Sequence, residues 1–243
     1  MDMLGLAIIC VFLFIATLGL KDLTAESLLY PLCLMLVLIL VSESDLVEPR
    51  AQFSTLRDLV FIAFFIHFFN FLCQGSLAGQ LGIRPRTVRG LVGIVFCPFL
   101  HQWSNNSKEH IFGNTTAFIT LGSLMVLQIG GEMFYKLTAC IALLSGAIIW
   151  LLGVSYGVYF GASAVVYGFM AFLVTLAVIS GRLVPMLFAI AAVIAYRRLF
   201  QQILLGKDSF GHSAGFAAGS IIAILSTASE SFKTLLELIP AIN

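Results

Sequence analysis

A serine and a histidine stand in two apolar, glycine-rich segments, where polar side chains are energetically expensive. Ser163 lies within residues 161–168, and His212 lies within residues 211–219. A serine hydroxyl becomes an effective nucleophile when a base takes its proton, and histidine is the usual base because its pKa lies near neutrality. Burial disfavours the imidazolium, so a buried histidine is ready to accept that proton. The pair is therefore a candidate for acyl-transfer chemistry, in which a serine attacks and a histidine takes its proton.

The two residues are expected at the same face of a membrane. Ser163 falls near the start of an apolar span over residues 161–180, and His212 near the start of another over residues 211–227. One span with short connections separates them, so both run in the same direction. Small residues let membrane helices approach closely, and four glycines surround the pair: Gly161, Gly168, Gly215 and Gly219. No acidic residue follows His212 in its helix, which favours a Ser–His dyad over a triad.

A third polar group precedes the pair in the chain. His110 and Asn114 are four residues apart, so they share one helix face at the start of a span over residues 108–127. Acyl transfer needs hydrogen-bond donors aimed at the developing oxyanion, and His and Asn side chains can supply them beside the Ser163 backbone N–H. The ordinary alternative is a helix N-terminus capped by polar residues. Taken alone, Ser163 also has an ordinary reading, as a serine bonded to its own helix backbone.

Composition places the chain in a membrane. Of 243 residues, 60% are hydrophobic and 10% are charged, and the mean hydropathy is +1.05. A soluble domain is nearer half apolar and about a quarter charged. A net charge of +1 gives no basic field for nucleic acid. The five cysteines form no C-x-x-C pair, and no phosphate loop, dinucleotide fingerprint or Cys/His cluster occurs, so neither a cofactor nor a metal is predicted.

The apolar pattern predicts an all-α polytopic bundle of eight spans. A membrane helix needs about 20 apolar residues. The candidates are residues 3–20, 27–42, 58–78, 108–127, 133–152, 161–180, 183–204 and 211–227. A polar break at residues 42–58 separates an N-terminal hairpin, assigned to residues 1–50, from a six-helix core with a short tail, assigned to residues 51–243.

The stretch from residue 80 to residue 108 is neither a span nor a plain loop. Its apolar part is too short to cross a bilayer, so it is expected to be interfacial or re-entrant. Arg84 and Arg86 at its start are interpreted as ligands for anionic headgroups. Two further pairs are expected to be structural, the buried pair His67 and Asn70 and the interfacial pair Glu132 and Lys136.

Taken in order, these motifs resemble those of the rhomboid family of intramembrane serine proteases. The family's H-x-x-x-N pattern corresponds to His110 and Asn114, and its G-x-S motif to Gly161 and Ser163. A G-H-x-x-G-x-x-x-G pattern occupies residues 211–219, and the likeness covers about residues 58–227. Each motif is weak alone, and the ordered set is specific.

The resemblance implies a role for each of these residues. Ser163 would be the nucleophile, His212 the general base, and His110, Asn114 and the Ser163 amide the oxyanion hole. It also implies a water-accessible cavity at the non-cytoplasmic side, where a substrate's transmembrane segment is cut. That topology puts Arg84, Arg86 and Arg89 outside, against the usual excess of basic residues in the cytoplasm. Partial embedding of residues 80–108 would account for this conflict.

The chain departs from the family pattern at two positions. Ala164 follows the serine, where the family usually has glycine. Many members place another histidine about five residues before the oxyanion-hole histidine. Here His101 lies nine residues before His110 and is assigned no role.

The predicted function is an intramembrane serine endopeptidase in a multi-pass protein of the bacterial cytoplasmic (inner) membrane. Its expected partners are membrane lipids and transmembrane protein substrates, with no nucleic acid, and the oligomeric state is left open. One alternative is a catalytically inactive rhomboid-like protein that binds transmembrane helices. The other is an unrelated transporter, which would more typically carry carboxylates inside the membrane. Between residues 59 and 206 the acidic residues are Glu109 and Glu132, both at span ends.

Overall fold

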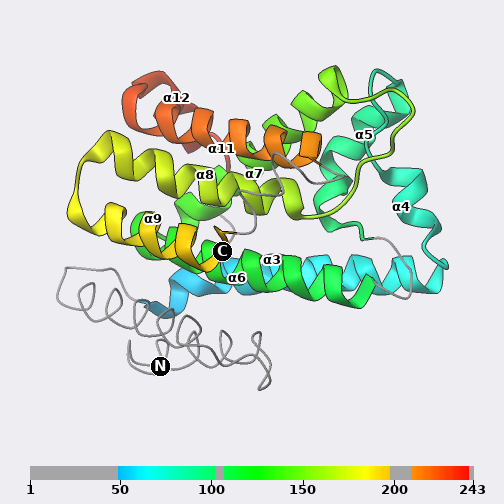
Figure 1. The fold of residues 1–243 in the computed structure, drawn as a ribbon, viewed down its shortest axis with the longest axis horizontal. Coiled ribbons are helices and arrows are strands. Elements are labelled where there is room, and N and C mark those ends of the chain that lie inside the picture. Colours follow the sequence, from blue (N-terminus) through cyan, green and yellow to red (C-terminus); the bar gives the residue numbers. More distant parts are fainter. Residues whose placement is uncertain (1–48, 102–106, 198–208, 241–243) are drawn as a thin grey trace.

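The structure, a computed structural model, describes residues 49–101, 107–197 and 209–240. These residues are mostly α-helical and contain no β-strand, which confirms the predicted all-α class (Figure 1). The expected N-terminal hairpin, with spans at 3–20 and 27–42, lies outside the described residues. Its division from the core at residue 50 therefore stays a prediction.

Six longer helices occupy the six predicted core spans. They are α3 (Pro49–Leu72), α6 (Ser107–Ile129), α7 (Gly131–Leu152), α8 (Ser163–Ser180), α9 (Leu183–Ala195) and α11 (Ser209–Ala228). Within the described residues, length and composition let three of them cross a membrane: α7, α8 and the Phe210–Ala228 part of α11. Shorter apolar helical stretches run over Asn114–Ile129 and Leu183–Ala195.

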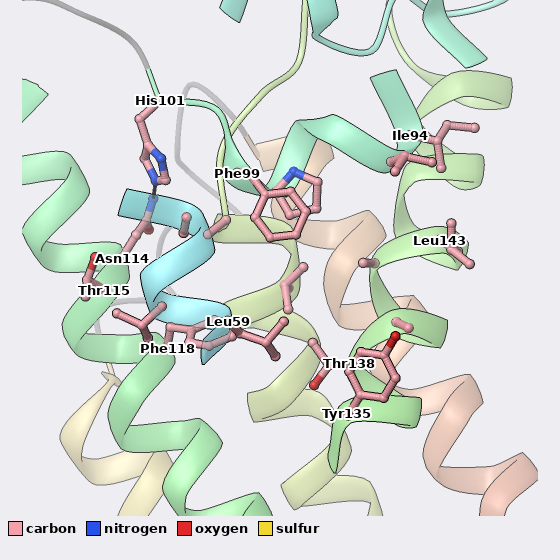
Figure 2. Close-up of a pocket in the computed structure, with 18 residues that line it drawn as sticks. Leu59, Ile94, Phe99, His101, Asn114, Thr115, Phe118, Tyr135, Thr138 and Leu143 are labelled. Carbon is pink, nitrogen blue, oxygen red and sulfur yellow. Dashed lines mark hydrogen bonds between the residues drawn. The ribbon is translucent and has the colours of Figure 1, made fainter. Parts of the chain in front are cut away.

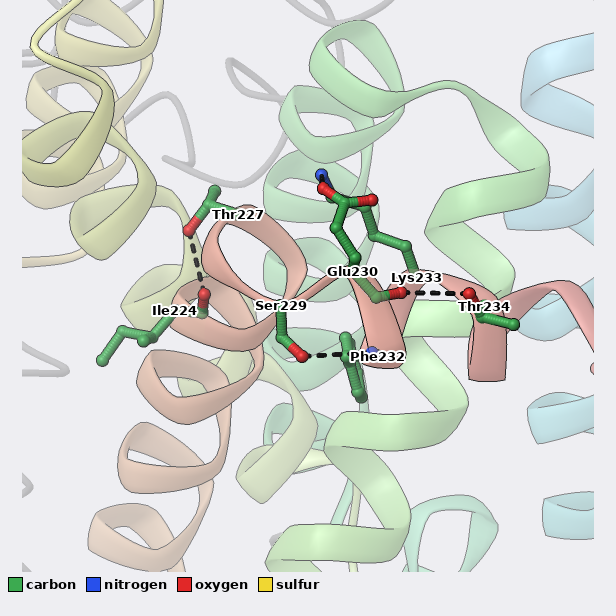
Figure 3. A network of polar contacts seen from close by, with 7 residues as sticks. All are labelled: Ile224, Thr227, Ser229, Glu230, Phe232, Lys233 and Thr234. Carbon is green, nitrogen blue, oxygen red and sulfur yellow. Dashed lines mark hydrogen bonds and ion pairs between the residues drawn. The ribbon is translucent and has the colours of Figure 1, made fainter.

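Several helix ends differ from the predicted boundaries. Helix α3 begins at Pro49, before the predicted residue 58, and α9 ends at Ala195, before the predicted residue 204. Helix α3 ends at Leu72, before the predicted residue 78, because Gln74 and Gly75 take positive φ angles of 53° and 79°. The short helix α4 (Ser76–Leu81) follows. The tail, expected to be short and mixed, forms α12 (Glu230–Glu237), where the Ser229 hydroxyl accepts a hydrogen bond from the Phe232 N–H at 3.2 Å (Figure 3). Such N-terminal caps stabilise a helix because they satisfy a free backbone donor.

Helix α8 forms the centre of the bundle. Every residue from Ala164 to Leu173 is buried, as expected for a helix that is apolar on all sides. It packs against α6, α7, α9 and α11, and Figure 1 shows it between α11 and the adjacent pair α3 and α6. The predicted pair at Glu132 and Lys136 is confirmed at the start of α7, with 2.6 Å between its charged atoms.

Helices α8 and α11 touch backbone to backbone at two glycines. A Cβ at Gly215 would lie 2.0 Å from the Ala164 carbonyl oxygen, and a Cβ at Gly219 would lie 2.0 Å from the Gly168 carbonyl oxygen. Both contacts advance by four residues in the same direction along each helix. The two helices therefore run parallel, with their N-terminal ends together.

Residues 82–101 fold back against α7 instead of forming a span. They contain α5 (Val88–Phe96) and the 3-10 turn η1 (Cys97–Phe99). The Thr87 hydroxyl caps α5 by accepting from the Gly90 N–H at 3.0 Å. Gly90 and Gly93 are buried, whereas Val88, Leu91, Val92 and Val95 are exposed. A short helix with an exposed apolar face suits the predicted interfacial position.

Arg86 fastens this segment to the end of α7. Its Nη1 donates to the carbonyl oxygens of Leu151 at 3.0 Å and Gly153 at 2.8 Å, and Nη2 contacts Ser155 Oγ. The last carbonyls of a helix have no intrahelical partner, and a cation there is favourable. Arg84 likewise donates to the Gly79 carbonyl at 2.8 Å. The structure thus gives both arginines backbone partners, where the sequence predicted lipid headgroups.

Replacing Gly215 with alanine is expected to force α8 and α11 apart, because the new methyl group would overlap the Ala164 carbonyl. Overpacking of this kind costs about 1–3 kcal/mol. The thermal unfolding midpoint of the detergent-solubilised protein should therefore fall by several degrees. Gly211→Ala is the matched control in the same helix, since its Cβ would meet Tyr159 Cδ1 at an ordinary 3.8 Å. Equal midpoints for the two variants would contradict the backbone contact.

Arg86→Ala is expected to loosen residues 82–101 by removing the bonds to the end of α7. The bond to the Gly153 carbonyl is partly buried and the other two contacts are exposed. A net contribution of about 0.5–1.5 kcal/mol per hydrogen bond is enough for their loss to accelerate amide exchange in this segment by a measurable factor. Hydrogen–deuterium exchange read by mass spectrometry tests this. Arg57→Ala serves as the control, because its ion pair with Asp58 is exposed. Unchanged exchange in Arg86→Ala would show that the segment is held by other contacts.

Candidate active site

Ser163 is the first residue of α8, and the loop before it is fixed to the segment 82–101. Ile83 and Tyr159 exchange two backbone hydrogen bonds of 2.8 and 2.9 Å, and the Gly161 N–H donates to the Cys97 carbonyl at 2.8 Å. Gly161 has a φ of +116°, a conformation that L side chains rarely adopt. Gly161 therefore belongs to the turn before α8. The Ser163 N–H belongs to the first turn of a helix, where backbone donors have no intrahelical acceptor.

His212 lies in the first turn of α11 with its ring stacked on Tyr167. The ring centroids are 4.2 Å apart and the planes differ by 19°. Tyr167 is one helical turn after Ser163, on the same face of α8, and the His212 side chain is 8% exposed. The stacking fixes the plane of the imidazole near the start of α8. The Ser163–His212 hydrogen bond itself stays a prediction.

Tyr167 is a candidate site residue that the sequence analysis missed. Its spacing of four residues from Ser163 was the available signal, because residues four apart share one helix face. An aromatic residue within an apolar helix is usually core, and Tyr167 is buried as a core residue would be. Its contact with His212 is visible only when α11 is placed against α8.

On α6, Asn114 is half-buried and its side chain meets His101. Asn114 Nδ2 lies 3.4 Å from His101 Nε2, and Figure 2 shows the two side chains pointing toward one another. The side chain of His110 lies outside the described residues, so its predicted role as an oxyanion donor stays a prediction. His101, which the sequence analysis left without a role, is the histidine that the structure places beside Asn114.

A cavity of about 300 Å³ adjoins these groups (Figure 2). His101, Asn114 and Ala162 are among its lining residues, and Ala162 directly precedes Ser163. The rest of the lining is largely apolar and comes from α3, α5, η1, α6, α7 and α8: Leu59, Val60, Ala63, Ile94, Val95, Pro98, Phe99, Thr115, Phe118, Tyr135, Thr138, Ala139, Ala142, Leu143 and Val165. This cavity can accept an apolar group next to the start of α8.

The Cys97 thiol contacts the Gly161 carbonyl in the loop before Ser163, and its chemistry differs from that of the serine. Burial raises the pKa of the Cys97 thiol to about 12, against a smaller opposing effect of its contact with the Gly161 carbonyl. A thiol held protonated is a poor nucleophile. Among residues 49–101, 107–197 and 209–240, no group of three or more His, Cys, Asp or Glu side chains is arranged to hold a metal ion.

Comparison with known sequences shows what this chain is similar to. A sequence model of the Rhomboid domain matches residues 88–229, which include Asn114, Ser163 and His212. Two uncharacterized proteins, from Mycobacterium tuberculosis and Mycobacterium bovis, are each 31% identical to the chain over 193 residues. Those alignments cover 73% of this chain and 76% of each relative. No solved structure matches it. With its apolar helical bundle and this extent of match, the chain belongs to the rhomboid family of integral membrane proteins.

Proposed function

We propose that this rhomboid protein is an intramembrane serine endopeptidase that uses Ser163 and His212 as a catalytic dyad. The observation that carries the proposal is the parallel backbone contact of α8 and α11, with His212 stacked on Tyr167 one turn after Ser163. That arrangement brings the N-terminal ends of both helices together. A nucleophile and its base must lie within hydrogen-bond reach, and such bonds often tighten only when substrate is bound.

The reaction follows from the chemistry of these groups. His212 takes the proton from Ser163 Oγ as the oxygen attacks a peptide carbonyl carbon, and a tetrahedral oxyanion forms. The Ser163 N–H, the Asn114 amide and the His110 ring stabilise that oxyanion as hydrogen-bond donors. His212 then gives its proton to the leaving amine, and the acyl-enzyme forms. Water, deprotonated by His212, attacks the acyl-enzyme, and His212 returns that proton to Ser163 Oγ as the carboxylic acid product leaves. This sequence requires no cofactor.

The proposed substrate is the transmembrane segment of another membrane protein. The lining of the cavity beside Ala162 is mostly apolar, which suits an apolar side chain from such a segment better than a polar one. Membership of a membrane-embedded family and the mycobacterial relatives support a multi-pass protein of the bacterial cytoplasmic membrane. The partners are then the surrounding lipids and the transmembrane substrates.

Labelling by an alkyl fluorophosphonate tests the dyad, because this probe reacts with activated serines. The detergent-solubilised protein is expected to be labelled, Ser163→Ala to lose all labelling, and His212→Ala to react at least about a thousandfold more slowly. Ser145→Ala is the matched control, since that buried hydroxyl bonds the Ala142 carbonyl of its own helix. Folded wild-type protein that takes up no label would point to a catalytically inactive family member.

Filling the cavity should slow the reaction of a probe whose chain binds there, without changing the reactivity of Ser163 itself. Ala139→Phe places a ring among the lining residues, so a long-chain alkyl fluorophosphonate should react about tenfold more slowly. A tenfold slowing corresponds to keeping roughly two methylene groups of the alkyl chain out of the cavity, because each buried methylene contributes about 0.8 kcal/mol. Diisopropyl fluorophosphate, which has no long chain, should react at the wild-type rate. The control is Ala147→Phe, on the exposed side of the same helix. Equal slowing of both probes in Ala139→Phe would rule out the cavity as the acceptor of the chain.

A further inference from the structure

Tyr159 connects the two elements that carry the proposed dyad. Its backbone belongs to the loop before Ser163, and its ring contacts the first turn of α11, which carries His212. We propose that Tyr159 is a positioning residue whose ring sets the place of His212 relative to Ser163. This inference rests on the proposed function, and it assigns a role to a residue that the dyad mechanism does not use.

The backbone of Tyr159 is fixed independently of its side chain. Its N–H donates to the Ile83 carbonyl at 2.9 Å, and its own carbonyl accepts from the Ile83 N–H at 2.8 Å. Two residues later, the Gly161 N–H donates to the Cys97 carbonyl at 2.8 Å. These backbone bonds hold the loop before Ser163 in place. A substitution of the Tyr159 side chain removes none of them.

The side chain of Tyr159 is also held at its far end. Its hydroxyl oxygen accepts a hydrogen bond from the Val154 N–H at 3.1 Å. A Cβ at Gly153 or at Gly157 would lie 3.2 Å from Tyr159 Cε2, so both glycines leave room for the ring. A ring that is fixed at both ends offers a neighbouring helix a defined surface.

The Tyr159 ring meets the start of α11 directly before His212. The centroids of the Tyr159 and Phe210 rings are 6.4 Å apart and their planes differ by 62°, which is an edge-to-face arrangement. A Cβ at Gly211 would lie 3.8 Å from Tyr159 Cδ1, so Gly211 lies beside the same ring. Because Phe210 and Gly211 directly precede His212, the ring sets the position of the histidine backbone against the loop that leads to Ser163.

This support lies where α11 needs it. Of the two glycine contacts with α8, the one nearer the start of α11 is at Gly215, and His212 lies almost one turn before it. The first turn of a helix frays more easily than the middle, because its backbone donors have no intrahelical acceptors. Stacking on Tyr167 orients the imidazole, and the Tyr159 ring supports the turn that carries it. A misplacement of about 1 Å at a reacting group can cost about a hundredfold in rate.

Phosphonylation of Ser163 by an alkyl fluorophosphonate tests this role in the full-length protein. Tyr159→Leu removes the ring, so we expect its rate to fall at least about tenfold. Tyr159→Phe keeps the ring and loses only the exposed hydroxyl bond, so it should retain most of the wild-type rate. Tyr156→Leu is the matched control, because Tyr156 lies in the same loop and is 93% exposed. Its rate should equal that of the wild type.

A double-mutant cycle with His212 separates positioning of the base from general loosening of the site. In the His212→Ala background, where the slow reaction is followed over hours, Tyr159→Leu should cause no further slowing. The reason is that the ring acts through the base, whereas the backbone bonds that hold the loop of Ser163 remain. Equal slowing in both backgrounds would overturn the positioning role, since a residue that only stabilises the fold acts whether or not the base is present.

The other contrary outcomes are distinct. An unchanged rate in Tyr159→Leu would overturn the positioning role while the dyad would stand. A rate in Tyr159→Phe as low as in Tyr159→Leu would overturn it too, because the ring would not be the group that acts. No reaction of folded wild-type protein would overturn the proposed function and this inference together. If Tyr159→Leu does not fold, Phe210→Leu replaces it in the cycle, because it removes the same ring contact from the side of α11.

Discussion

The backbone contact between α8 and α11 is the constraint on which the rest of the site depends. Lipid tails are as apolar as the helix surfaces, so membrane helices associate through close packing more than through the hydrophobic effect. Gly215 and Gly219 remove the side chains that would otherwise separate α11 from the Ala164 and Gly168 carbonyls. This closeness lets an imidazole on one helix lie flat against a ring of the other, one turn after Ser163. At a wider helix spacing, a serine on one helix and a histidine on the other would be too far apart to interact.

The segment over residues 82–101 is the second constraint on the site, because it connects α3 and α7 to the loop before α8. Arg86 holds it to the end of α7, the Ile83–Tyr159 pair holds it to the loop before Ser163, and Asn70 holds its end at His101. Each attachment satisfies backbone or amide groups that would otherwise be costly in an apolar setting. These bonds therefore hold the segment to α3, to the end of α7 and to the loop before Ser163.

The sequence predicts those features of the site that follow from the order of the spans and the spacing of residues within them. Span order alone puts Ser163 and His212 at the same end of parallel helices, and glycine spacing predicts a close approach there. It does not predict contacts between distant segments. Tyr167 looks like an ordinary core residue, and His101 meets Asn114, which lies thirteen positions further along the chain. Asn70 was paired with His67 by local spacing, yet its amide bonds the His101 carbonyl and the Ala78 N–H. Gly161 was assigned to helix packing, and its φ of +116° places it in a turn, which composition does not reveal.

The most direct test of the account is an experimental structure of the protein after reaction with a fluorophosphonate. The account predicts a covalent bond from Ser163 Oγ to phosphorus, the His212 ring within hydrogen-bond distance of that oxygen, and the phosphoryl oxygen facing the Ser163 N–H and the Asn114 amide. A phosphoryl oxygen directed away from Asn114, or an adduct on any residue other than Ser163, would contradict it.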